Sequence, residues 1–150
     1  MLAGGAVYFS ATDYIATGRE LYRWFPGASS QLVGDGLGSS GPAPRLFATD
    51  PVLGGAITFD GDAQPNAYGI VAVGLPAKPS GSFFTADLWV SLPAAVLLPV
   101  PANALGRWSI PPINLPNLPG LTGVRLAAQG LFTLGGPIDV SNGAMLTFGY

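Results

Sequence analysis

Glycine and proline interrupt this chain so often that no stretch of it is suited to a long helix. The sequence has 22 glycines and 15 prolines among 150 residues, and no long stretch keeps apolar residues at helical spacing without meeting one of them. The runs between them are short and rich in β-branched and aromatic residues, which is typical of strands joined by turns. We therefore predict an all-β fold, an antiparallel β-sandwich of the jelly-roll or immunoglobulin-like type, preceded by an N-terminal β-hairpin arm.

The chain carries few charges for its length. Charged residues make up 9% of the sequence and apolar residues 49%, whereas charged residues are about a quarter of ordinary soluble domains. Disordered chains are also rich in glycine and proline, but they combine low hydrophobicity with high net charge, and the net charge here is −2. We expect a folded domain, part of whose surface faces a partner. The alternative is a soluble monomer with a surface rich in serine, threonine, asparagine and glycine.

The short apolar runs define the predicted strands. These strands are Ala6–Thr12, Glu20–Phe25, Arg45–Ala48, Gly55–Phe59, Tyr68–Val73, Phe83–Val90, Ala95–Leu98, Gly106–Ile110, Gly123–Thr133, Ile138–Val140 and Ala144–Phe148. In Gly123–Thr133 apolar and mixed residues alternate, so one face of this strand should point into the core. Asn142-Gly143 supplies the two positive-φ positions of a type I′ turn, and we predict a C-terminal β-hairpin around it.

Two segments without the strand pattern divide the chain. Residues 29–43 are rich in glycine and serine, which favours a linker or long loop. Proline recurs in Ile110–Leu121 too often for a central strand, and we predict an extended crossover between two sheets there. The expected organisation is an N-terminal β-hairpin arm at residues 1–28, the linker or loop at 29–43 and a β-sandwich domain at 44–150.

The residues needed for most catalytic chemistry are missing. The sequence contains no histidine and no cysteine, which excludes a Ser-His-Asp triad, thiolate metal sites and disulfides. The eight acidic residues are scattered, and an enzyme would need some of them, such as Asp60, Asp62 and Asp87, to meet in an open cleft. The six basic residues form no patch for nucleic acid. We expect a protein that is not an enzyme and needs no cofactor.

One acidic segment is a candidate calcium site. Asp60 and Asp62 flank a glycine, with Asn66 nearby, and hard oxygen donors at such short spacing suit Ca²⁺. The competing interpretation is a hairpin turn that uses aspartate and glycine for its geometry.

The aromatic residues divide into candidate ligand contacts and candidate core. Tyr14 and Tyr68 are candidates for stacking against a sugar ring. Trp89 and Trp108 lie in apolar runs, and we expect both in the core. Gln129 is expected to be a buried strand residue whose amide ties down a loop carbonyl.

No membrane-spanning helix is expected. Leu88–Gly106 has no charged residue, but Pro93, Pro99 and Pro101 argue against a helix there and favour buried β structure. The N-terminal Met1–Val7 lacks the positive flank and long apolar core of a signal peptide. We expect that a signal was removed or that the sequence is a fragment.

The N-terminal residues resemble a known repeat. Val7–Asp13 followed by Gly18–Trp24 resembles one unit of the ELW-type β repeats of bacterial secreted and surface proteins. Those repeats have an aromatic-rich strand, a turn and then Gly-x-Glu-Leu-Trp. Here Tyr22 stands in place of the tryptophan, and Phe25–Gly27 replaces the Asp-Gly-Thr that usually follows.

The rest of the chain, residues 44–150, resembles an uncharacterised β domain. Proteins that carry this domain at the C-terminal end are secreted by planctomycete- and myxobacteria-like organisms. The segments that carry the resemblance are Pro51–Gly55, Gly69–Gly74, Leu115–Gly123, Leu126–Gln129 and Val140–Gly143. The resemblance implies export to the cell surface or the medium, and it carries over no catalytic residue.

A single repeat unit is too small to be stable alone, because such units bury their apolar face against neighbours. The arm must therefore dock on the main body of the same chain, or add a strand to an open sheet edge of a neighbouring subunit. The arm residues expected to make these contacts are Val7, Tyr8, Phe9, Leu21, Tyr22 and Trp24.

These expectations favour a structural subunit of an extracellular filament or surface assembly. Copies of the chain would be held together by shared β-strands, with apolar strands that would otherwise leave open edges. The alternative is a monomeric secreted adhesion or carbohydrate-binding module that presents aromatic residues to surface glycans.

Overall fold

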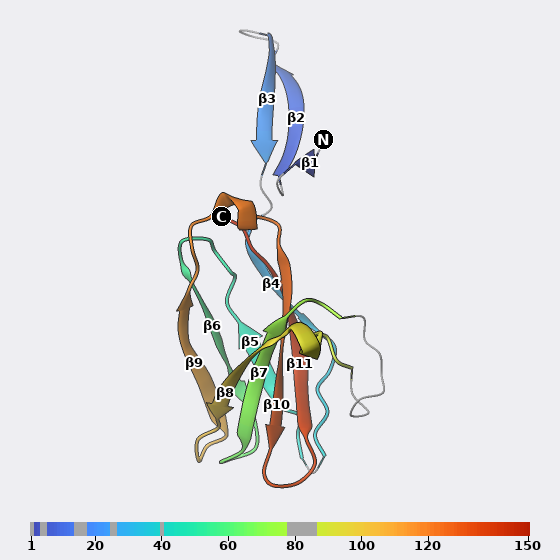
Figure 1. The fold of residues 1–150 in the computed structure, drawn as a ribbon, viewed down its shortest axis with the longest axis vertical. Helices are drawn as coiled ribbons and strands as arrows, with labels where there is room; N and C mark the ends of the chain where they lie inside the picture. Colours follow the sequence, from blue (N-terminus) through green and yellow to red (C-terminus); the bar gives the residue numbers. More distant parts are fainter. Residues whose placement is uncertain (1, 4–5, 14–17, 25–26, 40, 78–86) are drawn as a thin grey trace.

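The computed structural model describes residues 2–3, 6–13, 18–24, 27–39, 41–77 and 87–150. These residues form three antiparallel sheets (Figure 1). The N-terminal sheet has the order β1-β2-β3, with β1 at Leu2–Ala3, β2 at Ala6–Asp13 and β3 at Gly18–Trp24. The other two sheets pack as a sandwich, so the predicted all-β sandwich is confirmed.

The five-stranded sheet of the sandwich has the order β4-β11-β10-β7-β8. Its strands are β4 at Ser29–Val33, β7 at Tyr68–Gly74, β8 at Val96–Pro101, β10 at Arg125–Thr133 and β11 at Asp139–Thr147. The three-stranded sheet has the order β5-β6-β9. Its strands are β5 at Arg45–Ala48, β6 at Ala56–Asp62 and β9 at Arg107–Asn114. Short 3₁₀ helices lie at Leu92–Ala94 and Pro119–Leu121.

The main core lies between the two sheets of the sandwich. Its buried residues include Phe59 and Trp108 from the three-stranded sheet and Val71 and Phe132 from the five-stranded sheet. The rings of Trp108 and Phe132 have their centroids 5.4 Å apart. Trp108 is only 4% exposed, which confirms its prediction as a core residue. Each such side chain contributes roughly 1.5–3 kcal/mol by its burial.

A second layer covers the outer face of the five-stranded sheet. Leu88 packs with Leu131 and Val140, which belong to this sheet. Gln129, in β10, fixes the layer, because its Nε2 donates to the carbonyl of Asp87 at 2.9 Å and its Oε1 accepts the N–H of Trp89 at 2.9 Å. The prediction for Gln129 is therefore confirmed, and both faces of β10 are buried along much of its length.

Trp89 does not join the core between the sheets, as the sequence led us to expect. It is half-buried and lies against Gly143, where an added Cβ would come within 2.8 Å of its Cγ. Its place on the outer face follows from the extended segment that Gln129 holds there.

The predicted C-terminal hairpin is wrong. Asn142-Gly143 lies in the middle of β11, and residues 134–138 connect β10 to β11. Tertiary contacts outweigh the local turn preference. The Asn142 Oδ1 accepts the N–H of Leu46 at 2.9 Å, and its Nδ2 donates to the carbonyl of Leu46 at 3.0 Å. The register between β10 and β11 shifts between Gln129 and Leu131, beside this contact.

The segment predicted as a linker or loop contains a strand. Ser29–Val33 forms β4 and pairs with β11, from Val33 opposite Gly143 to Ser29 opposite Thr147. The sandwich therefore begins at Ser29, and the remainder of residues 29–43 runs outside the named strands.

The proline-rich stretch is partly strand and partly crossover. Pro111 and Pro112 lie in β9, which is an edge strand, and an edge strand tolerates residues that donate no ladder hydrogen bond. The residues after β9 cross to the five-stranded sheet and lead into β10, as predicted.

Residues 87–90, the described part of the predicted strand Phe83–Val90, belong to no named strand. Of the predicted strand Phe83–Val90, residues 83–86 lie outside the described residues, and 87–90 make only a single bridge between Val90 and Pro76. The described part of the chain contains no helix that is long and apolar enough to cross a membrane.

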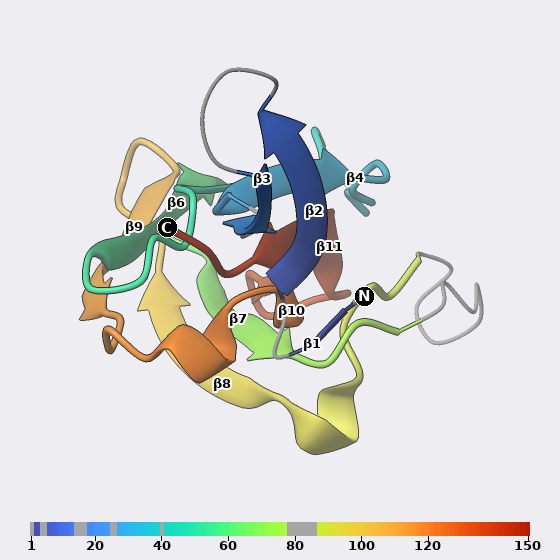
Figure 2. The same ribbon diagram turned by 90° about the horizontal axis from the view of Figure 1, so that it is seen from above.

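The N-terminal sheet lies beyond one end of the sandwich, the end at which the C-terminus is found (Figures 1 and 2). The predicted hairpin is present as β2 and β3, which pair from Val7 opposite Trp24 to Asp13 opposite Gly18. The short β1 extends it on the other side of β2.

Candidate functional site

The outer face of the three-stranded sheet carries two rows of cross-strand neighbours. One row is Arg45, Asp62 and Arg107, and the next is Phe47, Asp60 and Ser109. All six residues are exposed. Because residues two apart on a strand share a face, the rows place one aromatic ring beside four charged groups and a hydroxyl.

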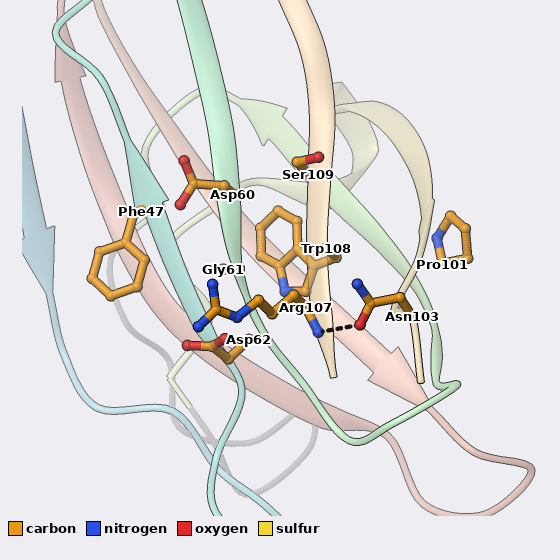
Figure 3. A pocket seen from close by; sticks show the side chains of 9 residues that line it. All are labelled: Phe47, Asp60, Gly61, Asp62, Pro101, Asn103, Arg107, Trp108 and Ser109. Carbon is orange, nitrogen blue, oxygen red and sulfur yellow. Dashed lines mark hydrogen bonds between the residues drawn. The ribbon is translucent and has the colours of Figure 1, made fainter. Parts of the chain in front are cut away.

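All of these residues except Arg45 line a shallow hollow of about 670 Å³, which Trp108 and Asn103 also line (Figure 3). The Oδ1 of Asn103 accepts the backbone N–H of Arg107 at 3.0 Å and that of Leu105 at 2.9 Å, and these bonds hold the turn that precedes β9. Gly61 faces inward, where an added Cβ would lie 2.7 Å from Cζ2 of Trp108 and would collide with the carbonyl of Arg45. The close packing under this sheet therefore depends on glycine at that position.

Asp60 and Asp62 lie in β6, and Asn66 follows in the next turn with a φ of 60°. The interpretation of the two aspartates as turn residues is therefore wrong, because the strand continues through both of them. Asp87 lies in the layer over the outer face of the five-stranded sheet, where Nε2 of Gln129 donates to its carbonyl. In the described part of the chain, no group of three or more histidine, cysteine, aspartate or glutamate residues could hold a metal ion.

An apolar groove of about 280 Å³ lies on the outer face of the five-stranded sheet. Tyr68, Ile70, Leu131 and Ile138 line it. Tyr68 is 75% exposed, so this candidate residue is accessible. It lies on a different sheet from Asp60 and Asp62, and the structure does not bring these candidates together. Tyr14 lies outside the described residues.

The edges of the five-stranded sheet are blunted. In β8, Pro99 and Pro101 occupy alternate positions while β8 stays paired to β7, so at these positions the free edge offers no N–H to an added strand. At the other edge, Oδ1 of Asp50 accepts the N–H of Ser30 in β4 at 2.6 Å.

The edges of the three-stranded sheet are blunted as well. Asn142 binds both backbone polar groups of Leu46 in β5, and β9 carries two consecutive prolines. Each of the four edge strands of the sandwich is therefore blunted at one or two positions. No sequence signal identified Asn142 as an edge cap, because its partner lies 96 positions away.

The predicted arm residues fall on two paired strands. Val7, Tyr8 and Phe9 belong to β2, and Leu21, Tyr22 and Trp24 belong to β3. Val7 is opposite Trp24 and Phe9 is opposite Tyr22, so four apolar or aromatic residues occupy neighbouring positions in the ladder.

No protein-family model matches the chain, and no curated protein matches it. The resemblances to the ELW-type repeat and to the uncharacterised secreted β domain therefore stay predictions.

Proposed function

We propose that this protein is a non-catalytic structural subunit of an extracellular filament or surface assembly, in which copies share β-strands through their N-terminal sheets. The observation that supports this most is the separate sheet β1-β2-β3, which has its own strand order and lies beyond the end of the sandwich (Figure 1). The extracellular location rests on the resemblance to secreted proteins.

The N-terminal sheet is too small to account for its own stability. A two- or three-stranded ribbon needs a covering layer or further strands to persist in water. Its ladder sets Val7 opposite Trp24 and Phe9 opposite Tyr22, and such residues stabilise a sheet only when they are removed from water. Docking against another copy supplies that burial.

The blunted sandwich edges restrict how copies can join. Since β4, β5, β8 and β9 are each blunted at one or two positions, the edges of the N-terminal sheet are the better candidates for strand addition. Pairing β3 of one copy with β1 of the next would repeat in one direction, and a head-to-tail contact that does not close gives a filament. Pairing two β3 strands with each other would give a closed dimer.

Deletion of residues 1–28 tests the proposal. The truncated protein should remain folded and monomeric, while the full-length protein forms particles that electron microscopy shows as filaments or layers. Light scattering at several concentrations measures the loss of assembly. Assembly of the truncated protein to the same size as the full-length chain would rule out the N-terminal sheet as the shared element.

A monomeric secreted adhesion or carbohydrate-binding module is the second candidate function. It is favoured by the exposed ring of Tyr68 beside the apolar groove. A glycan array tests it with the full-length protein and the variants Tyr14→Ala and Tyr68→Ala. Loss of binding in either variant supports a stacking role for that residue, and an array that stays blank with folded protein argues against this function.

A further inference from the structure

We propose that the hollow on the outer face of the three-stranded sheet binds a neutral saccharide, stacked on Phe47 and hydrogen-bonded by Asp60 and Arg107. This inference does not depend on assembly, because the hollow lies on a different sheet from the N-terminal strands. It also concerns a different surface from the groove beside Tyr68.

Phe47 supplies the apolar part of the site. Phe47 is 41% exposed, while the preceding Leu46 is fully buried in the core. The strand therefore turns the ring outward, over the hollow (Figure 3). One exposed aromatic ring is ordinary on a protein surface. Here it is flanked by charged and polar groups. An apolar aromatic face with polar neighbours suits a sugar, which has an apolar C–H face and a polar rim.

The polar groups supply both kinds of hydrogen bond. Carboxylates accept, a guanidinium donates, and a hydroxyl does both. Asp60 and Ser109 belong to the same row of the hollow as Phe47, and Asp62 and Arg107 belong to the next row. All stand on strands, so their directions are set before a ligand arrives, which lowers the entropy lost on binding.

Trp108 closes the hollow on the side of the core. Its indole is almost wholly buried and packs against the ring of Phe132, with the centroids 5.4 Å apart. The hollow therefore has a packed floor beneath its polar groups.

The charges indicate which saccharides fit. The hollow is lined by Asp60, Asp62 and Arg107, and it is neutral in sum only together with Arg45, the cross-strand neighbour of Asp62. Phosphate, sulfate and carboxylate groups would meet Asp60 and Asp62 as well as the arginines, so a neutral ligand is favoured over an acidic one. The volume of about 670 Å³ is within the range of roughly 300–1,000 Å³ for small-molecule sites, and the open shape admits part of a longer chain.

The test uses the full-length protein on an array of neutral hexose and N-acetylhexosamine oligosaccharides, with sulfated and sialylated glycans beside them. The hit is then titrated by calorimetry. Phe47→Ala should weaken binding about tenfold or more, and Arg107→Gln should weaken it as well. Tyr150→Ala is the matched control, because it removes an aromatic residue that is also about half exposed but does not line the hollow, and it should leave the affinity unchanged.

Melting temperature and near-ultraviolet circular dichroism establish that each variant is folded. Three results would overturn the proposal: folded protein that binds no neutral glycan, a preference for acidic glycans, or an affinity that falls with Tyr68→Ala and not with Phe47→Ala. Assembly of Phe47→Ala should match that of the unchanged protein. Loss of glycan binding with intact assembly therefore separates this inference from the proposed structural role.

Discussion

The sandwich and the N-terminal sheet treat their strand edges in opposite ways. In the sandwich, proline or a side-chain hydrogen bond occupies each of the four edge strands. In the N-terminal sheet, β1 and β3 form the edges, and neither carries a proline. Proteins blunt edges to prevent unwanted pairing. The difference supports the proposal that copies pair through the N-terminal sheet rather than through the sandwich.

The largest expected effect comes from removing the cap on β5. Asn142→Ala leaves the N–H and carbonyl of fully buried Leu46 without their side-chain partner, and two such groups should cost about 3 kcal/mol of unfolding free energy. Urea denaturation measures the change. Asn114→Ala, on the exposed end of β9, is the control and should shift stability by less than about 0.5 kcal/mol. Equal stability of the two variants would show that the cap contributes nothing.

Gln129→Ala should have the next largest effect. It removes the bonds to Asp87 and Trp89 and another to the carbonyl of Ser141 at 2.9 Å. We expect a loss of about 2 kcal/mol, together with faster hydrogen exchange at the amide of Trp89, because the covering layer loses its anchor. Unchanged exchange at that amide would mean that apolar packing alone holds the layer.

Restoring N–H donors to β8 should change association more than stability. The double variant Pro99→Val and Pro101→Val, made in the chain without residues 1–28, should alter the unfolding free energy by less than about 1 kcal/mol. It should nevertheless self-associate, because the edge can then accept a strand. Sedimentation velocity detects this, with Pro116→Val, in the crossover, as control. A double variant that stays monomeric would show that the prolines do not protect this edge.

Trp24→Ala should have the smallest effect on the stability of the sandwich, within about 0.5 kcal/mol, since Trp24 belongs to β3 and not to the sandwich. It should weaken assembly in light scattering. Arg19→Ala, in the same strand, serves as the comparison. Full assembly of Trp24→Ala would show that copies pair without a contribution from the Trp24 side chain.

The sequence reveals the parts of this fold that depend on local pattern. The strand β5, the inner face of β10, the buried Trp108 and the amide of Gln129 were all predictable, because alternation and residue type carry that information. The turn predicted at Asn142-Gly143 is wrong because the turn preference of Asn-Gly is local, whereas the contact of Asn142 with Leu46 spans 96 positions.

The strand β4 and the hollow were not predictable for a related reason. Ser29–Val33 has no clear alternation, and its pairing with β11 decides its conformation. The hollow depends on register, because only the pairing of β5, β6 and β9 brings Phe47, Asp60 and Arg107 to one face. Asp60 was singled out from the sequence, but for a calcium site rather than for its cross-strand neighbours.

Hydrogen exchange in β3 tests the central claim most directly. The full-length protein is compared in its assembled form and as dilute single copies, with the amides of β10 as an internal reference. If copies share strands through the N-terminal sheet, the β3 amides should exchange at least about tenfold more slowly in the assembly, while the β10 amides exchange alike in both. Equal exchange of the β3 amides in the two forms would contradict strand sharing by this sheet.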